Sequence, residues 1–152
     1  MSEGDQARIK PGYVLRAEEI TEPEMSGQDW IDFAEGVRLF NRGDYWESHE
    51  AWEYVWKRHP EPVRVFFQAL IQLAAAYHQL ARGIHHGVIK HLRNSETKLH
   101  PFPDRFLGVD LQPIKQALSA GIDETLRLGP GGLDAFDPEL IAEIDFIRPG
   151  QY

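Results

Sequence analysis

The chain has 152 residues, of which 42% are hydrophobic, and this is enough apolar material for one ordinary domain core with little left for a second. It contains no cysteine, which excludes disulfides, thiolate metal sites and cysteine nucleophiles. The formal net charge is −8 and there is no run of lysine or arginine, so neither nucleic acid nor an anionic membrane is expected as a partner. No apolar segment opens the chain, which favours a cytoplasmic location.

Residues 1–29 are predicted to form an extended N-terminal arm, because they are polar and contain proline and glycine without a sustained hydrophobic period. The apolar residues that could attach this arm are Tyr13, Val14, Leu15 and Ile20. They can hold the arm as a strap along its own bundle, or they can dock it on a second copy of the chain. A homo-oligomer is therefore one of the two arrangements that the arm predicts.

Two helices are predicted on either side of Gly43. Helical periodicity begins near Trp30 and ends at Gly43, a glycine that can adopt a positive φ. A second helix is predicted from Asp44 to about His59. Asp44 can cap this helix while the Glu47 side chain, three residues later, bonds back to it, which is a capping-box arrangement.

Three further helices follow a break at two prolines. The third helix is predicted over 62–81, and Gly83 supplies the turn to a fourth helix over 85–99. A fifth helix begins after Pro113 and ends at the glycine-rich stretch that starts at residue 129. A short sixth helical segment is predicted over 138–146.

These elements predict an all-α fold, a compact bundle of two antiparallel helical hairpins plus a fifth helix, with the extended N-terminal arm. The hairpins should turn near Gly43 and Gly83. The bundle domain covers 30–128, and 129–152 form a C-terminal tail with a short helix. No segment of the bundle domain alternates with a period of two, so we expect no β-strand there.

A histidine lies in the predicted apolar stripe of the second helix. The stripe is spaced by four, three and four residues and consists of Tyr45, His49, Trp52 and Trp56. A buried imidazole needs a hydrogen-bond partner, because an unsatisfied buried polar group costs about 1–3 kcal/mol. We therefore expect His49 to be mostly buried and bonded to Glu53, one turn away, in preference to Glu47.

The third helix is apolar except for an edge of glutamines that should meet this stripe. A glutamine amide both donates and accepts, so it can join a buried network with His49 and Glu53. The predicted polar site consists of Tyr45, Glu47, His49, Glu50, Glu53, Gln68, Gln72 and His78.

The same residues carry a family resemblance. The motif is aromatic-glycine-aromatic-Glu-x-His-Glu-x-x-Glu, followed by Leu-Ile-Gln, and its positions are Phe40, Gly43, Tyr45, Glu47, His49, Glu50, Glu53, Leu70, Ile71, Gln72, His78, Gly83 and Gly87. Over about residues 30–99 this pattern resembles domain of unknown function family 309, a small all-helical family of bacteria and archaea. The resemblance implies a helical bundle with this polar set, and it implies no established activity.

Two functional hypotheses follow from the motif. Residues 49–53 are similar to the HExxH pattern of zinc proteases, with Glu53 in place of the second histidine, and His78 could be a third ligand. A single HxxxE pair supplies only two ligands, so no metal and no cofactor is predicted. We prefer an interaction or scaffold module whose polar network is architectural. The alternative is a small metal-dependent or hydrolase-like enzyme that uses His49, Glu50 and Glu53. A core in which every polar group has an internal partner would favour the interaction or scaffold module. An open pocket at His49 would favour the enzyme.

Overall fold

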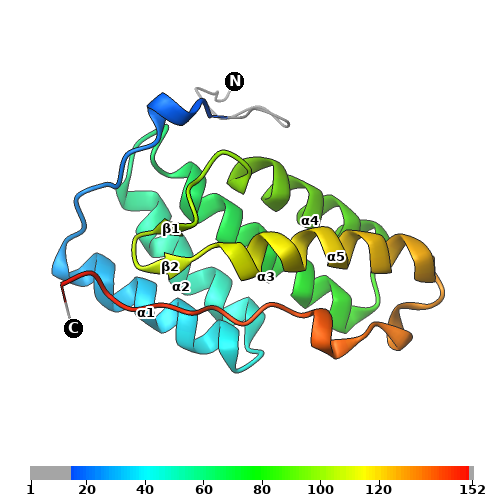
Figure 1. Cartoon of the computed structure of the whole chain (residues 1–152). Helices are drawn as coiled ribbons and strands as arrows, with labels where there is room; N and C mark the ends of the chain where they lie inside the picture. The colour runs from blue at the N-terminus through cyan, green and yellow to red at the C-terminus, as the bar shows by residue number, and fades with distance from the viewer. Residues whose placement is uncertain (1–14, 151–152) are drawn as a thin grey trace, which may run out of the picture.

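The computed structural model describes residues 15–150, and helices dominate this part of the chain (Figure 1). The helices are α1 (Gly27–Asn41), α2 (Tyr45–Arg58), α3 (Val65–Arg82), α4 (His85–Leu99) and α5 (Gln112–Leu128). The shorter elements are the strands β1 (Arg105–Phe106) and β2 (Val109–Asp110) and the 3-10 turns η1 (Ala17–Glu19), η2 (Leu133–Ala135) and η3 (Pro138–Leu140). The all-α prediction is confirmed. Within residues 15–150, no helix combines the length and the apolar character needed to cross a membrane.

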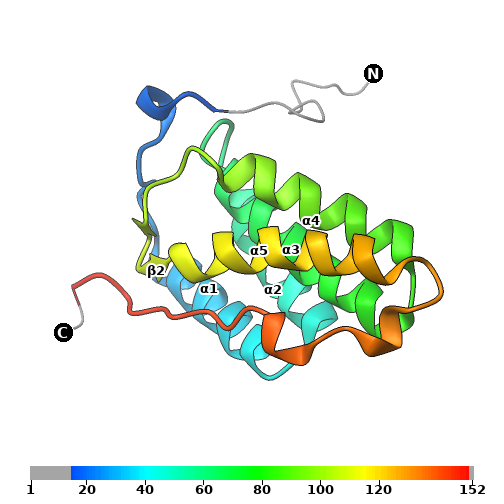
Figure 2. The same ribbon diagram turned by 45° about the vertical axis from the view of Figure 1, so that its right-hand side comes forward.

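The helices pack in chain order as two antiparallel hairpins followed by α5 (Figures 1 and 2). The α1–α2 turn is made at Gly43, whose φ is +86°, and the α3–α4 turn at Gly83, whose φ is +73°. Both values lie in the left-handed region that glycine adopts without a steric penalty, so the predicted turns are confirmed. α5 packs against α4 and buries Ile114 and Leu118 in the common core.

The buried side of α2 is centred on Trp52, which faces the core as predicted. The residues that lie beside Trp52 on this side are not the ones predicted. Trp52 is fully buried, and its Nε1 donates a hydrogen bond to the carbonyl of Phe33 at 3.2 Å. Ser48 is also fully buried and donates to the carbonyl of Gly36 at 2.8 Å. Because Ser48 and Val55 share the centre of this side with Trp52, His49 lies at its edge and not in its middle as predicted.

A short β-hairpin between α4 and α5 contradicts the expectation that the bundle domain contains no strand. Its register pairs Phe106 with Val109, and the two residues between them, Leu107 and Gly108, have φ values of +49° and +79°. Positive φ at both central residues is the conformation of the tight two-residue hairpin turn. Each strand has two residues, which is too short to produce a period-two pattern in the sequence.

The C-terminal tail is an extended strap along α1 and not the helix predicted over 138–146 (Figure 1). The Asn41 side chain holds it with two hydrogen bonds to the backbone of Ile144, Nδ2 to the carbonyl at 2.9 Å and the amide to Oδ1 at 2.8 Å. The Tyr77 hydroxyl accepts a hydrogen bond from the Ala142 amide at 2.9 Å. Helical structure after Pro138 is limited to η3 because these contacts use backbone groups that a helix would need.

The described part of the N-terminal arm packs on its own bundle. Leu15 is buried, Ile20 packs against the core, and the Glu22 carboxylate accepts a hydrogen bond from the Leu107 amide at 2.8 Å. Tyr13 and Val14, the other two apolar residues predicted to attach the arm, lie outside the described residues. Residues 15–22 therefore form the strap that was one of the two predicted arrangements.

Candidate functional site

The predicted site lies on the side of α2 that faces α3, and His49 is its central residue. The His49 side chain is 17% exposed, so it is mostly buried as predicted. Its Nε2 lies 3.6 Å from a carboxylate oxygen of Glu53, and this residue, rather than the exposed Glu47, is the neighbouring acid. A separation of 3.6 Å is too long for a hydrogen bond. The pair is therefore close but loosely joined.

The indole of Trp46, a residue that the sequence interpretation missed, lies against two histidines. Its ring is 4.8 Å from the His49 ring in a stacked arrangement and 5.2 Å from the His78 ring. These contacts place His49 of α2 and His78 of α3 on the same side of the bundle, as predicted. Trp46 itself is 47% exposed, so this cluster reaches the surface. Its position one turn before His49 is the signal that could have identified it.

Four buried polar atoms on α2, α3 and α4 have no hydrogen-bond partner among residues 15–150. They are His49 Nδ1 on α2, Gln72 Oε1 and Gln79 Oε1 on α3, and His91 Nδ1 on α4. Each such atom costs about 1–3 kcal/mol when it is sealed from water without a partner. We call this surface of α2, α3 and α4 the motif face and define it by Trp46, His49, Gln72, His78, Gln79 and His91.

The electrostatics of the motif face disfavour a charged His91. Burial lowers the pKa of His91, and electrostatic interaction with Lys90 and His49 lowers that pKa further. The influence of His49 shows that the two imidazoles, on α2 and α4, are electrostatic neighbours. The fold therefore disfavours the charged form of at least one imidazole of the motif face.

The close approach of α4 to Gln79 of α3 depends on Gly87. A Cβ atom at Gly87 would lie 3.0 Å from Cγ of Gln79 and 3.2 Å from its Cδ. Such contacts are closer than packed carbon atoms normally allow, so a side chain at Gly87 would displace Gln79. Gly87 therefore makes the space in which the Gln79 amide lies.

Within residues 15–150, no hydrogen bond joins the remaining predicted site residues to His49. Tyr45 is half-buried, and its ring contacts Phe40 at 5.2 Å and Tyr77 at 5.3 Å, while burial raises its pKa. Gln68 is half-buried, and Glu50 is exposed. Tyr45 therefore belongs to the aromatic core.

The predicted capping box at the start of α2 does not form. Asp44 occupies the position before the helix, but its side chain makes no capping hydrogen bond. It lies instead 3.3 Å from the Arg42 guanidinium. Glu47 is exposed and does not bond back to Asp44, so its side chain faces solvent.

Within the described part of the chain, no three histidine, aspartate or glutamate side chains come close enough together to hold one metal ion. The three alternative ligands His49, Glu53 and His78 are included in this statement. The indole of Trp46 contacts both histidines. The geometry therefore gives no support to the three-ligand alternative.

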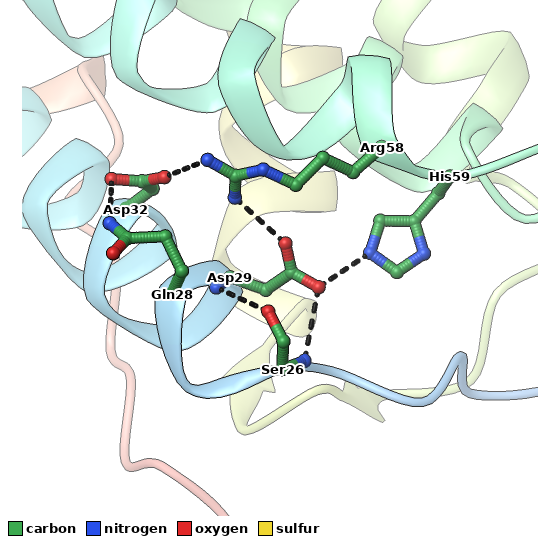
Figure 3. Close-up of polar contacts among 6 residues, drawn as sticks. All are labelled: Ser26, Gln28, Asp29, Asp32, Arg58 and His59. Carbon is green, nitrogen blue, oxygen red and sulfur yellow. Dashed lines mark hydrogen bonds and ion pairs between the residues drawn. The ribbon is translucent and has the colours of Figure 1, made fainter.

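A second polar cluster, which the sequence interpretation missed, joins the first turn of α1 to the end of α2 (Figure 3). We call it the charge clamp and define it by Ser26, Asp29, Asp32, Arg58 and His59. The Asp29 carboxylate accepts hydrogen bonds from Arg58 at 2.8 Å, from His59 Nε2 at 3.0 Å and from the Ser26 amide at 3.1 Å. Arg58 also donates to Asp32 at 2.6 Å.

The charge clamp is satisfied by its own members. Burial alone would raise the pKa of Asp29, but the hydrogen bonds from Arg58, Ser26 and His59 outweigh it and lower that pKa. Asp29 is therefore ionised, and because a carboxylate can only accept, His59 Nε2 is the donor of their hydrogen bond. The Ser26 hydroxyl accepts from the Asp29 amide at 3.0 Å and caps α1, and it points away from His59 (Figure 3). The cluster is thus an ion-pair clamp and not a nucleophile with its base.

Only part of the charge clamp has a local sequence signal. Ser26 and Asp29 have the three-residue spacing of a capping box, and the structure contains both of its hydrogen bonds. This signal could have placed the start of α1 at Gly27. Nothing in the local sequence pairs Asp29 with His59, which follows it by thirty residues.

Comparison with known families agrees with the motif. Residues 33–91 match the model of the family DUF309, which is described as a domain of unknown function. The match runs from α1 to the middle of α4 and includes every member of the motif face. The resemblance drawn from the motif is therefore confirmed. No curated protein matches the sequence.

Proposed function

We propose that this chain, whose residues 33–91 match a family of unknown function, is a helical interaction module that binds a partner through the motif face. The observation that carries the proposal is the set of four buried polar atoms without partners, on His49, Gln72, Gln79 and His91. An architectural network would supply internal partners for these atoms, as the charge clamp does for Asp29. Polar groups of a bound partner would supply them at the motif face.

The same geometry supports recognition better than the catalytic alternative with His49, Glu50 and Glu53. Glu50 is exposed, and the described residues give it no hydrogen bond or ion pair. Glu53 and His49 are 3.6 Å apart, so no hydrogen bond from the acid orients the imidazole. Trp46, in contrast, has the exposure and the central position that aromatic residues have in protein interfaces.

Site-specific photo-crosslinking in the native cells tests this proposal. A photoreactive amino acid at position 46 should give discrete protein adducts, because this position lies in the motif face. The matched control is position 126, where Leu126 is exposed on α5. Adducts at 46 that are absent at 126 support the proposal. The absence of adducts at 46, or the same adducts at both positions, would contradict it.

A substitution within the motif face links the adducts to the unpartnered atoms. Gln72→Leu removes the unpartnered Oε1 and keeps a side chain of similar size, so the fold should be retained. In the Gln72→Leu background the adducts at position 46 should become weaker. Unchanged adducts in a folded Gln72→Leu variant would show that the partner does not use this atom.

A further inference from the structure

α2 has a solvent-facing side next to the motif face. Successive residues of a helix are rotated by about 100° around its axis. On this basis, six side chains of α2 point away from the core, on the side opposite Trp52. We call this side the outer face of α2, and its members are Trp46, Glu47, Glu50, Glu53, Tyr54 and Lys57. The Glu53 side chain is 39% exposed, and the other five residues are exposed. The outer face shares Trp46 with the motif face, so a partner bound at one can continue along the other.

Two large aromatic side chains stand on the outer face. Trp46 is 47% exposed and Tyr54 is 59% exposed, and they are two of the five large hydrophobic side chains that are exposed in the described part of the chain. Indole and phenol rings are enriched among the residues that carry binding energy in interfaces. Their faces also attract guanidinium and ammonium groups. The pair therefore suits a partner that brings cations.

Three carboxylates lie among these rings, at Glu47, Glu50 and Glu53. Neighbouring like charges three residues apart on a helix repel each other. In the described residues Glu47 and Glu50 have no ion pair, and Glu53 has the loose contact with His49 at 3.6 Å. Lys57 is the cation of this face, and no ion pair joins it to Glu53 within 4.0 Å. A cationic partner would remove this repulsion.

From this arrangement we propose that the outer face of α2 binds a basic segment of a partner protein, with arginine or lysine side chains over the rings of Trp46 and Tyr54 and in ion pairs with the carboxylates between them. The two rings are eight residues apart, which is about 12 Å along a helix. An extended chain covers this distance with about four residues. The inference rests on the proposed function and names the chemistry of the partner.

Binding of a defined peptide tests the assignment. The probe is a fluorescent peptide of alternating arginine and glycine, and the measurement is its anisotropy with the full-length protein at low and at high salt. The peptide should bind to the wild type and weaken as salt screens the charges. The variant with Glu47→Gln, Glu50→Gln and Glu53→Gln should bind about tenfold more weakly. Trp46→Ala should also weaken binding, by loss of the cation–π contact.

The control separates the outer face from the general attraction of a chain with net charge −8. A variant with Asp134→Asn, Glu139→Gln and Glu143→Gln loses the same charge from exposed positions in the C-terminal tail. This variant should bind the peptide as the wild type does. Equal losses in the two variants, or no binding to the wild type, would overturn the basic-segment assignment. If adducts at position 46 nevertheless persist, the interaction module stands and the partner is not basic. If both experiments fail, both proposals fall.

Discussion

The charge clamp and the motif face are both built partly on α2, and they treat buried polar groups in opposite ways. In the charge clamp, the Asp29 carboxylate receives three hydrogen bonds from other members. In the motif face, His49 Nδ1 and Gln72 Oε1 are buried and receive none. Internal partners stabilise a fold, whereas missing partners are a cost that binding can offset. The comparison therefore assigns stability to the charge clamp and is the reason for our proposal that the motif face binds a partner.

The largest effect should come from Asp29→Ala, which breaks the charge clamp. The change leaves His59 and Arg58 without their shared carboxylate and removes the capping contact to the Ser26 amide. We expect the free energy of unfolding to fall by about 3 kcal/mol, which is the lower end of the range for breaking a buried ion pair. The lower end applies because the Arg58 side chain is 37% exposed and can be hydrated again. Urea denaturation measures this loss.

The control for Asp29→Ala is Glu35→Ala on the same helix. Glu35 forms an ion pair with Arg38 at 2.6 Å, but both side chains are about half exposed. Its removal should leave the urea midpoint essentially unchanged. Equal losses for the two substitutions would show that the burial of Asp29 adds nothing.

Acid should release the charge clamp in a defined range. In the folded chain the pKa of Asp29 lies below its ordinary value of 3.8. Its ionised form therefore stabilises the fold above pH 3.8, and this contribution is lost as pH falls through the lower folded-state pKa. A series of urea denaturations from about pH 5 down to pH 2 should show a shallower loss of stability for Asp29→Asn than for the wild type. Parallel profiles would contradict the role given to Asp29.

The helices and their turns follow from local chemistry, and the sequence therefore predicted them well. Gly43 and Gly83 end helices by adopting a positive φ, which other residues avoid. The two helix ends can therefore be recognised from the sequence without knowledge of the fold. Trp52 was also placed correctly in the core, because it lies at helical spacing from other apolar residues. The existence of the helices and the positions of their glycine turns are thus the part of this structure that local patterns determine.

The elements that the sequence did not predict depend on distant partners. The tail is extended because Asn41 bonds the backbone of Ile144, and no local pattern reveals a contact across that separation. The same holds for the bond between His59 and Asp29. His49 was assigned to the centre of the buried side because aromatic neighbours suggested a stripe there, while the small Ser48 that occupies the centre was overlooked.

The motif face should respond to pH in a higher range than the charge clamp. Burial and electrostatic interaction with Lys90 and His49 hold the pKa of His91 below its ordinary 6.5 in the folded chain. The unfolded chain therefore binds a proton first as pH falls below 6.5, and stability decreases from there until the folded-state pKa is passed. His91→Gln should flatten the stability profile between about pH 7 and pH 5. If the stability of His91→Gln falls with pH as steeply as that of the wild type, this role of His91 is contradicted.

A smaller effect on stability is expected for Gly87→Ala. This variant should change partner binding while changing stability little. Alanine is favoured over glycine within a helix by about 0.5–1 kcal/mol, but the new Cβ would lie 3.0 Å from Gln79 Cγ. The two effects oppose each other, so the melting temperature should change little while Gln79 moves. Adducts at position 46 should weaken in Gly87→Ala. Unchanged adducts would show that the position of Gln79 is irrelevant to the partner.

The free energy of unfolding of Gln72→Leu tests the central claim most directly, because it asks whether a buried polar group of the motif face serves the fold. Urea denaturation at neutral pH gives the value for this variant and for the wild type. The account predicts that Gln72→Leu is as stable as the wild type or more stable, since an unpartnered amide oxygen is replaced by an apolar group of similar size. A loss of about 1 kcal/mol or more would show that Gln72 has a structural partner, and the distinction between the two regions would fail.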